Sequence, residues 1–455
     1  MYTSLVSHCL FPLHERLKGH TTVALRKAME ASQWWDGAQL DQLRLERLQA
    51  LLRDVGEQVP YYHRLFAEIG FDPAGVQSLN DLQRLPFLDK ALIRAHTEDL
   101  KHRGAEGLAR FNTGGSSGQP LVFFIGKRRV SHDVAAKWRA TRWWGVDIGD
   151  PEIVVWGSPI ELGAQDRLRR WRDRLLRTDL LPAFEMSDAK LDGFIAAIRH
   201  KRPRMLFGYP SALTHIALHA EKRGIAMDDL GIKVAFVTSE RLYDEQRATI
   251  ARVFGCRVAN GYGGRDAGFI AHECPEGGMH LTAEDILLEL VDAQGQPVPA
   301  GQAGEIVVTH LATRDFPFIR YRTGDVAVLD DKRCACGRGL PVLREIQGRS
   351  TDFVTAANGT VMHGLALIYI IRDLSGVEAF KVVQESLTHT RVLLVPGPGF
   401  DPACKAQIVA GFQRRLGGEV QVDVDCVDTI PPEKSGKFRY IVSHVGASQP
   451  VANAS

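Results

Sequence analysis

The sequence predicts an α/β protein in which a large N-terminal domain of doubly wound mixed sheets is followed by a small α+β C-terminal domain. Three patterns support this prediction. Short apolar runs alternate with amphipathic helical segments in the first half, strands separated by turns follow, and helix and strand patterns alternate again near the end. Of the 455 residues, 45% are hydrophobic and 24% charged, which is typical of globular proteins.

The first half of the chain has the alternation that a largely parallel sheet requires. Leucines at helical spacing predict a helix over residues 38–56, and Leu191–Ile198 predicts another. Three apolar runs between such helices are predicted strands: Ile153–Trp156, Met205–Gly208 and Lys233–Val237. Strands and helices in alternation favour a parallel sheet covered by helices on both faces.

The rest of the chain is predicted as two further units. Turn-separated strands predict a more antiparallel or barrel-like β unit over residues 256–348, within a large domain spanning residues 1–348. Its predicted strands are Ile286–Val291, Glu305–Thr309 and Val326–Leu329. Residues 349–446 have the order of a split βαβ unit, and residues 447–455 are predicted as a disordered tail. The predicted elements of the small domain are the helices Gly364–Leu374 and Pro402–Leu416, the strands Phe380–Gln384 and Arg391–Val395, and a strand containing Val420, Val422 and Val424.

Charge and cysteine content exclude several functional classes. The 56 basic and 54 acidic residues give a net charge of +2, so we expect no nucleic-acid partner. Seven cysteines, an odd number in a long chain, do not suit a disulfide framework and favour the reducing cytoplasm. The sequence shows no transmembrane segment, and its first residues do not resemble a signal peptide.

The strongest local motif is the glycine-rich segment 113–120, with the sequence TGGSSGQP. Its glycines let backbone N–H groups approach an anion, and its hydroxyls add donors, which suits the phosphates of a nucleotide. It lacks the Gly-Lys-Ser/Thr ending of a Walker A loop. A flexible surface turn is the alternative. The candidate binding residues are Thr113, Gly114, Gly115, Ser116, Ser117 and Gly118.

A second motif, Asn260–Asp266, follows a strand-like segment and places an aromatic ring between glycines. Tyr262, between Gly261 and Gly263, can lie flat against the ring of a ligand. Asp266 can hold Mg²⁺ through its carboxylate. The alternative is a glycine-rich hairpin with no ligand.

Two later motifs carry a single charged residue beside a glycine. Asp325, after Thr-Gly, can accept hydrogen bonds from two ribose hydroxyls, although a turn with an ordinary salt bridge has the same pattern. Lys437, in Ser435–Arg439, can reach a developing negative charge, although a solvated basic loop has the same composition.

In their order, these four motifs resemble those of the adenylate-forming enzymes, the superfamily of acyl-CoA synthetases, peptide-synthetase adenylation domains and luciferases. Within it, the chain is most similar to the phenylacetate–CoA ligases and their relatives in capsule and exopolysaccharide gene clusters. Val59–Phe66 and Leu85–Lys90 also resemble that branch. The resemblance extends from about Phe11 to Val445.

This resemblance implies an ATP-dependent ligase that works in two steps. A carboxylate of a small acid attacks the α-phosphate of ATP, giving acyl-AMP and pyrophosphate, and a thiol then takes the acyl group. The thiol belongs to CoA or to the phosphopantetheine of a carrier protein. Mg²⁺ is the expected cofactor, and the small C-terminal domain is expected to be mobile, rotating between the two steps.

The resemblance also assigns roles to residues. The phosphate segment would bind the β- and γ-phosphates, Asp266 would serve Mg²⁺, and Lys437 would bridge the carboxylate and the α-phosphate. The residues expected around adenine and ribose are Ser239, Glu240, Gly261, Tyr262, Gly263, Asp325 and Arg349.

Three departures from the family pattern stand out. The superfamily usually has glutamate where Asp266 stands, so Mg²⁺ is expected to be held through water. Gly115 stands where serine is common, and the usual hinge acid is replaced by Thr351, with Asp352 next. The pivot is therefore Thr351 or Asp352.

Four further residues form a candidate metal site. Cys274 and His280 are six residues apart, and Cys334 and Cys336 are two apart. Three thiolates and one imidazole suit tetrahedral, structural Zn²⁺, and relatives in this branch have similar sets. Surface thiols and an unrelated histidine are the alternative.

The segment 167–177 contains six arginines around Trp171. It suits CoA phosphates, an acidic carrier protein or anionic lipid, and a solvated basic helix face is the alternative.

The leading functional prediction is an AMP-forming acid–thiol ligase. One alternative is a ligase that forms an amide with a free amine. Another is a catalytically silent nucleotide-binding scaffold or sensor, against which the presence of Lys437 argues.

Overall fold

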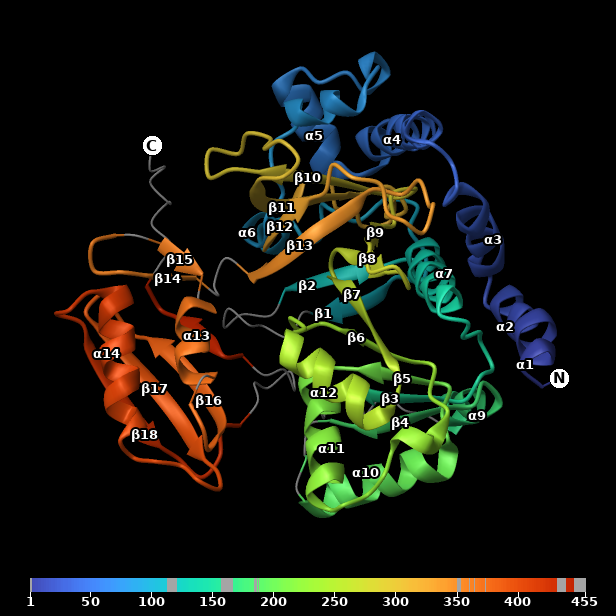
Figure 1. Cartoon of the computed structure of the whole chain (residues 1–455). Coiled ribbons are helices and arrows are strands. Elements are labelled where there is room, and N and C mark those ends of the chain that lie inside the picture. The colour runs from blue at the N-terminus through green and yellow to red at the C-terminus, as the bar shows by residue number, and fades with distance from the viewer. Residues whose placement is uncertain are drawn as a thin grey trace.

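The computed structural model describes residues 2–112, 121–156, 167–183, 186, 188–349, 353–359, 361–363, 365–372, 374–431 and 439–445. It is a mixed α/β protein with a large sheet-containing part and a small α+β part, as the sequence predicted (Figure 1). No helix within these residues is long and apolar enough to cross a membrane.

An N-terminal series of helices lies along one side of the large part, coloured blue in Figure 1. Its longest helix, α4, begins at a capping box in which Asp36 and Gln39 bond each other's backbone N–H groups. The helices are α1 (Tyr2–Leu5), the π-helix η1 (Val6–Leu10), α2 (Phe11–Leu17), α3 (Thr22–Ser32), α4 (Gly37–Gln58), α5 (Pro60–Ile69), the short 3₁₀ turns η2 (Pro73–Gly75) and η3 (Leu79–Arg84), and α6 (Lys90–Ala95).

A doubly wound parallel sheet forms the middle of the large part. Its strands are β3 (Glu152–Trp156), β4 (Thr178–Pro182), β5 (Met205–Gly208), β6 (Val234–Thr238) and β7 (Arg257–Gly264). The connecting helices are α9 (Arg167–Leu175), α10 (Asp188–Lys201), α11 (Pro210–Lys222), the turn η4 (Asp228–Leu230) and α12 (Asp244–Phe254).

Alternate residues along these strands pack into two separate cores, because successive side chains point to opposite faces. Leu206 and Ala235 pack with α10, α11 and α12, whereas Phe207 and Phe236 pack with α7 (Lys127–Trp143) on the other face. This accounts for the continuous apolar runs by which the sequence predicted β5 and β6.

Antiparallel strands continue the same sheet beyond β7. The strand order is β10-β11-β12-β13-β9-β8-β7-β6-β5-β3-β4. The added strands are β8 (Gly268–Glu273), β9 (Met279–Leu281), β10 (Ile286–Val291), β11 (Ala303–His310), β12 (Tyr321–Leu329) and β13 (Val342–Arg349), and a separate hairpin pairs β1 (Ala109–Asn112) with β2 (Val122–Ile125). The sequence predicted a more antiparallel or barrel-like unit here. The antiparallel pairing is confirmed, and because β8 pairs with β7, these strands extend the large sheet.

The C-terminal part has its own core and lies on the left in Figure 1. Its four-stranded sheet has the order β18-β17-β16-β19, with an antiparallel centre and parallel outer pairs. The elements are β14 (Phe353–Thr355), β15 (Val361–His363), α13 (Leu365–Arg372), β16 (Val377–Gln384), β17 (His389–Pro396), α14 (Cys404–Leu416), β18 (Gln421–Cys426) and β19 (Ile441–Ser443).

Candidate functional site

Two residues of different predicted motifs, Tyr262 and Asp325, touch in the folded chain. Tyr262 lies on β7 and Asp325 on β12, and the tyrosine hydroxyl donates a hydrogen bond to Asp325 Oδ2 over 2.8 Å. Burial and the Asp325 carboxylate raise the pKa of Tyr262 well above its ordinary value. The phenol therefore stays protonated and holds the carboxylate in one orientation.

The next strand brings a third predicted residue to the same place. In the antiparallel pairing of β12 with β13, Asp325 lies opposite Arg349. Asp325 and Arg349, both expected at the ribose, are therefore backbone neighbours across the ladder. The Arg349 side chain lies outside the described part of the structure.

The glycines around Tyr262 have packing reasons of their own. A Cβ atom on Gly263 would lie 2.1 Å from the carbonyl oxygen of Gly268, at an irregularity in the β7–β8 pairing. A Cβ atom on Gly261 would lie 2.8 Å from the Phe236 ring. Both positions need glycine for the sheet itself, so the motif is explained in part without a ligand.

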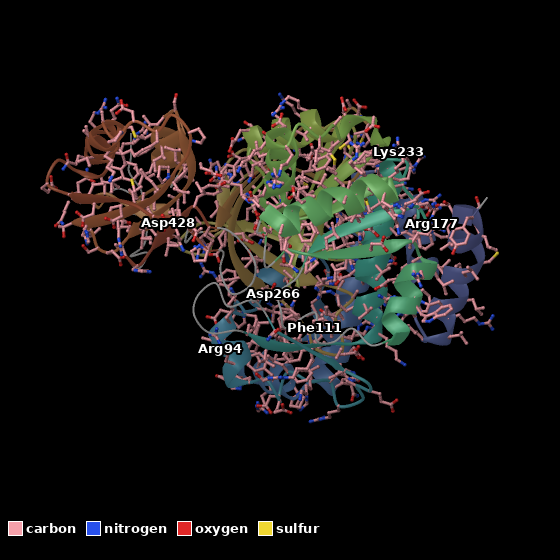
Figure 2. The ribbon with its side chains drawn as sticks, turned by 90° about the horizontal axis from the view of Figure 1, so that it is seen from below. Arg94, Phe111, Arg177, Lys233, Asp266 and Asp428 are labelled. Atoms are coloured by element: carbon pink, nitrogen blue, oxygen red, sulfur yellow. The ribbon has the colours of Figure 1, made fainter. Side chains whose placement is uncertain are left out.

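The turn after β7 positions Asp266, which is labelled in Figure 2. Its Oδ2 accepts a hydrogen bond from the Tyr321 hydroxyl over 2.6 Å, and its Oδ1 accepts one from the Ala267 N–H over 3.1 Å. From helix α7, Arg129 Nη2 donates hydrogen bonds to the backbone carbonyl oxygens of Arg265 (3.4 Å) and Asp266 (3.3 Å). Two hydrogen bonds thus hold the carboxylate and two hold the backbone of its turn, while the residue remains partly exposed.

Ser239 and Glu240 follow directly after β6, at the carboxyl end of the parallel strands. Ser239 has φ of +73°, a backbone conformation that costs energy in a residue other than glycine. The Glu240 carboxylate accepts a hydrogen bond from the Ser211 N–H over 3.2 Å, at the start of α11. Both residues therefore lie where ligands bind in open α/β sheets.

Several predicted residues lie outside the part of the chain that the structure describes. These are the phosphate-segment residues Thr113, Gly114, Gly115, Ser116, Ser117 and Gly118, the hinge candidates Thr351 and Asp352, and Lys437. The strands flanking the phosphate segment are described: β1 and β2 pair with Asn112 opposite Val122.

The four predicted zinc ligands come together at the far end of β8 and β9. Their ligand atoms all lie within 4.8 Å of one another. Cys274 Sγ is 3.6 Å from Cys334 Sγ, and His280 Nε2 is 3.1 Å from Cys336 Sγ. The strand pairing His280↔Val342 brings the loop that carries the last two cysteines onto β9.

The neighbourhood of this cluster suits a tetrahedral ion. Sulfur atoms bound to zinc at about 2.3 Å lie about 3.8 Å apart, close to the observed Cys274–Cys334 separation. His280 Nδ1 contacts the Leu340 carbonyl oxygen over 3.1 Å, so Nε2 is the nitrogen that faces the thiols. Burial lowers the pKa of His280 to about 4, which keeps the imidazole neutral. A Cβ atom on Gly278 would lie 2.6 Å from Cys334 Sγ, so glycine at this position leaves room for the thiol.

Replacing Cys334 with serine is expected to remove bound zinc and to lower the melting temperature by about 5–15 °C. Elemental analysis and calorimetry of one preparation measure both. Cys426→Ser is the matched control, because Cys426 is exposed on β18 and outside the cluster. Wild-type protein that contains no zinc after expression in zinc-supplemented medium would contradict the metal site.

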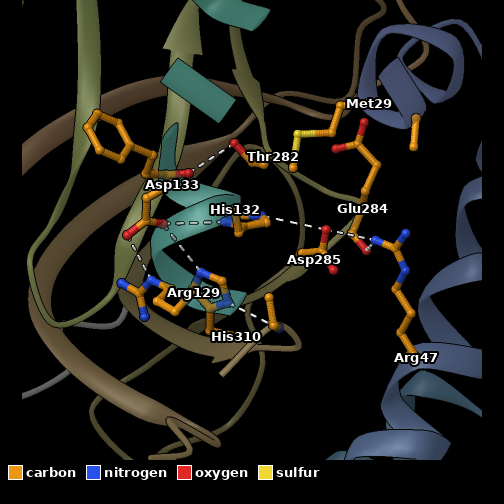
Figure 3. Close-up of polar contacts among 12 residues, drawn as sticks. Met29, Arg47, Arg129, His132, Asp133, Thr282, Glu284, Asp285 and His310 are labelled. Atoms are coloured by element: carbon orange, nitrogen blue, oxygen red, sulfur yellow. Dashed lines mark hydrogen bonds and ion pairs between the residues drawn. The ribbon is translucent and has the colours of Figure 1, made fainter. Parts of the chain in front are cut away.

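A network of buried charges supports the Asp266 turn from the interior (Figure 3). Arg129 Nε lies 2.9 Å from Asp133 Oδ2, and His132 and His310 face the same carboxylate at 3.3 and 3.9 Å. Burial raises the pKa of Asp133, but Arg129 and hydrogen bonds from the two histidines outweigh it and hold the pKa well below normal. Asp133 is therefore ionised and neutralises the Arg129 guanidinium that holds the turn.

The same network reaches α4 through the loop between β9 and β10. His132 Nε2 is 3.5 Å from Asp285 Oδ2, which pairs with Arg47 over 2.7 Å. Although His132, Asp133 and His310 have metal-ligand atoms close together, Arg129 already neutralises their single carboxylate, which argues against a cation there.

Sequence reasoning missed Arg129 and Tyr321 as parts of this site. Tyr321 lies four residues before Asp325, and no role was predicted for it from the sequence. Arg129 lies in the first turn of α7, whose basic start has the composition of a solvated face. Arg129 bonds residues 136 and 137 positions away, so nothing in the local pattern signals its role.

Two protein families match parts of the chain. The family described as AMP-binding enzyme matches residues 180–312, which contain Ser239, Tyr262 and Asp266. The family described as CapK C-terminal domain matches residues 354–444, which contain most of the C-terminal part.

Curated relatives span most of the chain. A phenylacetate-coenzyme A ligase of Thermus thermophilus is 29% identical over 392 residues, 84% of each protein. Protein CapK of Staphylococcus aureus is 23% identical over 420 residues, 89% of this chain and 90% of that protein.

Among solved structures, a 2-hydroxyisobutyryl-CoA ligase in the postadenylation state, in complex with R3-HIB-AMP, has a TM-score of 0.75 at 22% identity. The alignment covers 90% of this chain and 91% of that one. At this identity the likeness establishes the fold.

Proposed function

Because the chain belongs to the adenylate-forming enzymes, in the phenylacetate–CoA ligase-like branch near CapK, we propose that it is an AMP-forming acid–thiol ligase. It activates a small carboxylic acid with ATP and transfers the acyl group to CoA. The single observation that carries this proposal furthest is the contact between Tyr262 and Asp325, which joins two motifs 63 residues apart into one candidate nucleoside site.

In the first step, a carboxylate oxygen of the acid forms a bond to the α-phosphorus of ATP, and the bond to pyrophosphate breaks. Asp325, oriented by Tyr262, accepts hydrogen bonds from the ribose hydroxyls, with Arg349 on the neighbouring strand. The phosphate segment receives the β- and γ-phosphates, and Lys437 neutralises charge at the α-phosphate.

Asp266 is the residue that holds Mg²⁺ in this proposal. Its position between Tyr321, Ala267 and Arg129 supports a fixed carboxylate at the edge of the nucleotide site. The ion supplies positive charge against the phosphate oxygens. A Zn²⁺ ion held by Cys274, His280, Cys334 and Cys336 would be structural, because four protein ligands would leave no open position.

In the second step, the CoA thiolate attacks the acyl carbon, AMP leaves, and the thioester forms. We propose that the C-terminal domain, residues 349–446, rotates about Thr351 or Asp352 between the two steps, carrying Lys437 away and admitting the thiol. Its separate hydrophobic core supports movement as a unit.

The proposal is tested by incubating the protein with ATP, Mg²⁺, CoA and a panel of aryl, hydroxy, fatty and amino acids, and measuring AMP and thioester by mass spectrometry. Thioester and AMP in equal amounts are expected with at least one acid. AMP and an amide with added amines, but no thioester, would assign the amide-forming reaction instead. ATP binding without turnover of any acid would favour a silent scaffold.

Replacing Asp325 with alanine is expected to lower kcat/KM for ATP by about 10–100-fold, since two ribose hydroxyls lose their acceptor. Tyr262→Phe keeps the ring and removes only the hydrogen bond to Asp325, so a loss of about 2–10-fold is expected. Steady-state kinetics at saturating acid measure both. Equal losses in the two variants would contradict a direct contact of Asp325 with the nucleotide.

A further inference from the structure

The N-terminal helices and α9 present a row of exposed apolar side chains. Leu17 is 80% exposed, Trp171 69% and Leu13 56%. Of the twelve large hydrophobic residues exposed in the described part of the chain, seven belong to residues 2–17 and 171–175. Such a concentration in two short segments is unusual, because single exposed leucines are normally scattered.

These side chains are held in place by the opposite side of the same helices. The run α1–η1–α2 continues as one helix through its π-helical middle. Val6 and Phe11 are buried on the inner side, where the Phe11 ring meets Trp138 of α7 edge to face at 5.1 Å. The exposed leucines therefore form the outer stripe of an anchored amphipathic helix.

The arginine-rich helix α9 lies beside this stripe. The Tyr2 hydroxyl donates a hydrogen bond to the Leu175 carbonyl oxygen over 2.8 Å, and the Arg177 guanidinium lies 5.5 Å from the centre of the Tyr2 ring. Figure 2 shows Arg177 against the N-terminal helices, away from Asp266. The leucine stripe and the described arginines thus form one region, which we call the leucine–arginine surface: Leu5, Leu10, Leu13, Leu17, Trp171 and Leu175, with Arg172, Arg174 and Arg177.

The charge of this surface is strongly positive. Residues 167–177 contain six arginines and a single acid, Asp173, which pairs with Arg172 over 2.5 Å. In residues 2–20, the acid is Glu15, which is buried, whereas Arg16 and Lys18 are exposed. Residues 2–20 thus expose leucines and basic residues but no acid, and α9 adds tryptophan and arginines. This composition is typical of a segment that lies in a membrane interface.

We propose that the leucine–arginine surface binds the headgroup region of an anionic lipid membrane, with its leucines and Trp171 entering the acyl boundary. A solvated basic face explains the arginines but not the leucines, which gain nothing from water. An acidic carrier protein must deliver its thiol to the nucleotide site, yet the surface lies at the edge of the molecule opposite the C-terminal part (Figure 1). The inference does not depend on the proposed reaction.

The test is sedimentation of the full chain with vesicles of phosphatidylcholine, with and without phosphatidylglycerol. Binding is expected only with phosphatidylglycerol and is expected to weaken as salt is added. Leu13→Ser/Leu17→Ser and Arg172→Gln/Arg174→Gln are each expected to reduce the vesicle-bound fraction at a given lipid concentration by about tenfold or more. Unchanged melting temperatures establish that both variants fold.

Matched controls come from other surfaces of the chain. Arg414→Gln/Arg415→Gln removes two exposed charges on α14, and Leu218→Ser/Leu387→Ser removes two exposed leucines. Both controls are expected to bind vesicles like wild type. Absence of wild-type binding, or equal losses in the controls, would overturn the proposal. Light scattering tests whether the surface instead joins two copies of the chain. The proposal would also be overturned if Leu13→Ser/Leu17→Ser changed a dimer to a monomer and left vesicle binding unchanged.

Discussion

Replacing Arg129 with methionine is expected to destabilise the protein by about 2–4 kcal/mol and to impair the use of Mg²⁺–ATP. The stability loss follows because Asp133, only 20% exposed, loses the cation 2.9 Å away. The functional loss follows because Arg129 is a positioning residue: it donates to the carbonyl oxygens of Arg265 and Asp266. We expect the half-saturating Mg²⁺ concentration and the KM for ATP to rise by about tenfold at a temperature where the variant is folded.

Arg139→Met separates these two effects. Arg139 lies on the same helix, is 1% exposed and pairs with the equally buried Glu284 over 2.5 Å. Its hydrogen bonds go to Glu284 and to the Met29 carbonyl oxygen rather than to the Asp266 turn. It is expected to lose at least as much stability while retaining its Mg²⁺ dependence. Arg129→Lys, which keeps the charge with fewer donors, is expected to recover stability more than Mg²⁺ affinity. Mg²⁺ titrations of Arg129→Met and Arg139→Met, run in parallel, measure the difference. If the two variants have the same half-saturating Mg²⁺ concentration, Arg129 has no positioning role.

Replacing Lys437 with alanine is expected to slow acyl-adenylate formation by about 10²–10³-fold. The variant loses the charge that the proposal assigns to the α-phosphate, where negative charge develops in the transition state. Thioester formation from synthetic acyl-AMP and CoA is expected to change far less, because the proposal gives the lysine a role only in the first step. Rapid-quench measurement of each half-reaction provides the comparison.

Lys434→Ala is the control for this experiment, since it removes the same charge three residues earlier. It is expected to retain both half-reactions. If both lysine variants slow adenylation equally, the segment contributes general positive charge and the specific assignment to Lys437 is wrong.

Local sequence predicted several strands from apolar runs bounded by turns. Met205–Gly208, which is buried along its whole length, and Ile286–Val291, which is partly exposed at its centre, both have the predicted bounds. Pairing was less predictable. The strands after Gly268 have the same local pattern whether they close a barrel or extend a sheet, and their partners decide between the two.

The residues of the candidate site likewise fall into two groups: those that a local motif identifies and those that only the folded structure brings to the site. Tyr262, Asp325 and Asp266 carry glycine-based motifs, so each could be singled out before any contact was known. Arg129 carries no motif, and its role comes from helix α7 crossing beneath a turn that is distant in sequence. The arginines of residues 167–177 were visible in the sequence, whereas their neighbouring leucine stripe depends on the packing of Phe11 against Trp138.

Acyl-adenylate formation is the central claim, and acid-dependent exchange of labelled pyrophosphate into ATP measures it without any acceptor thiol. With Mg²⁺ and a matching carboxylic acid, wild-type protein is expected to incorporate label into ATP, because the first step is reversible. Omitting the acid is expected to abolish the exchange. Acid-dependent release of ADP and phosphate, with no exchange of pyrophosphate, would contradict the claim, since the acid would then be activated at the γ-phosphate of ATP.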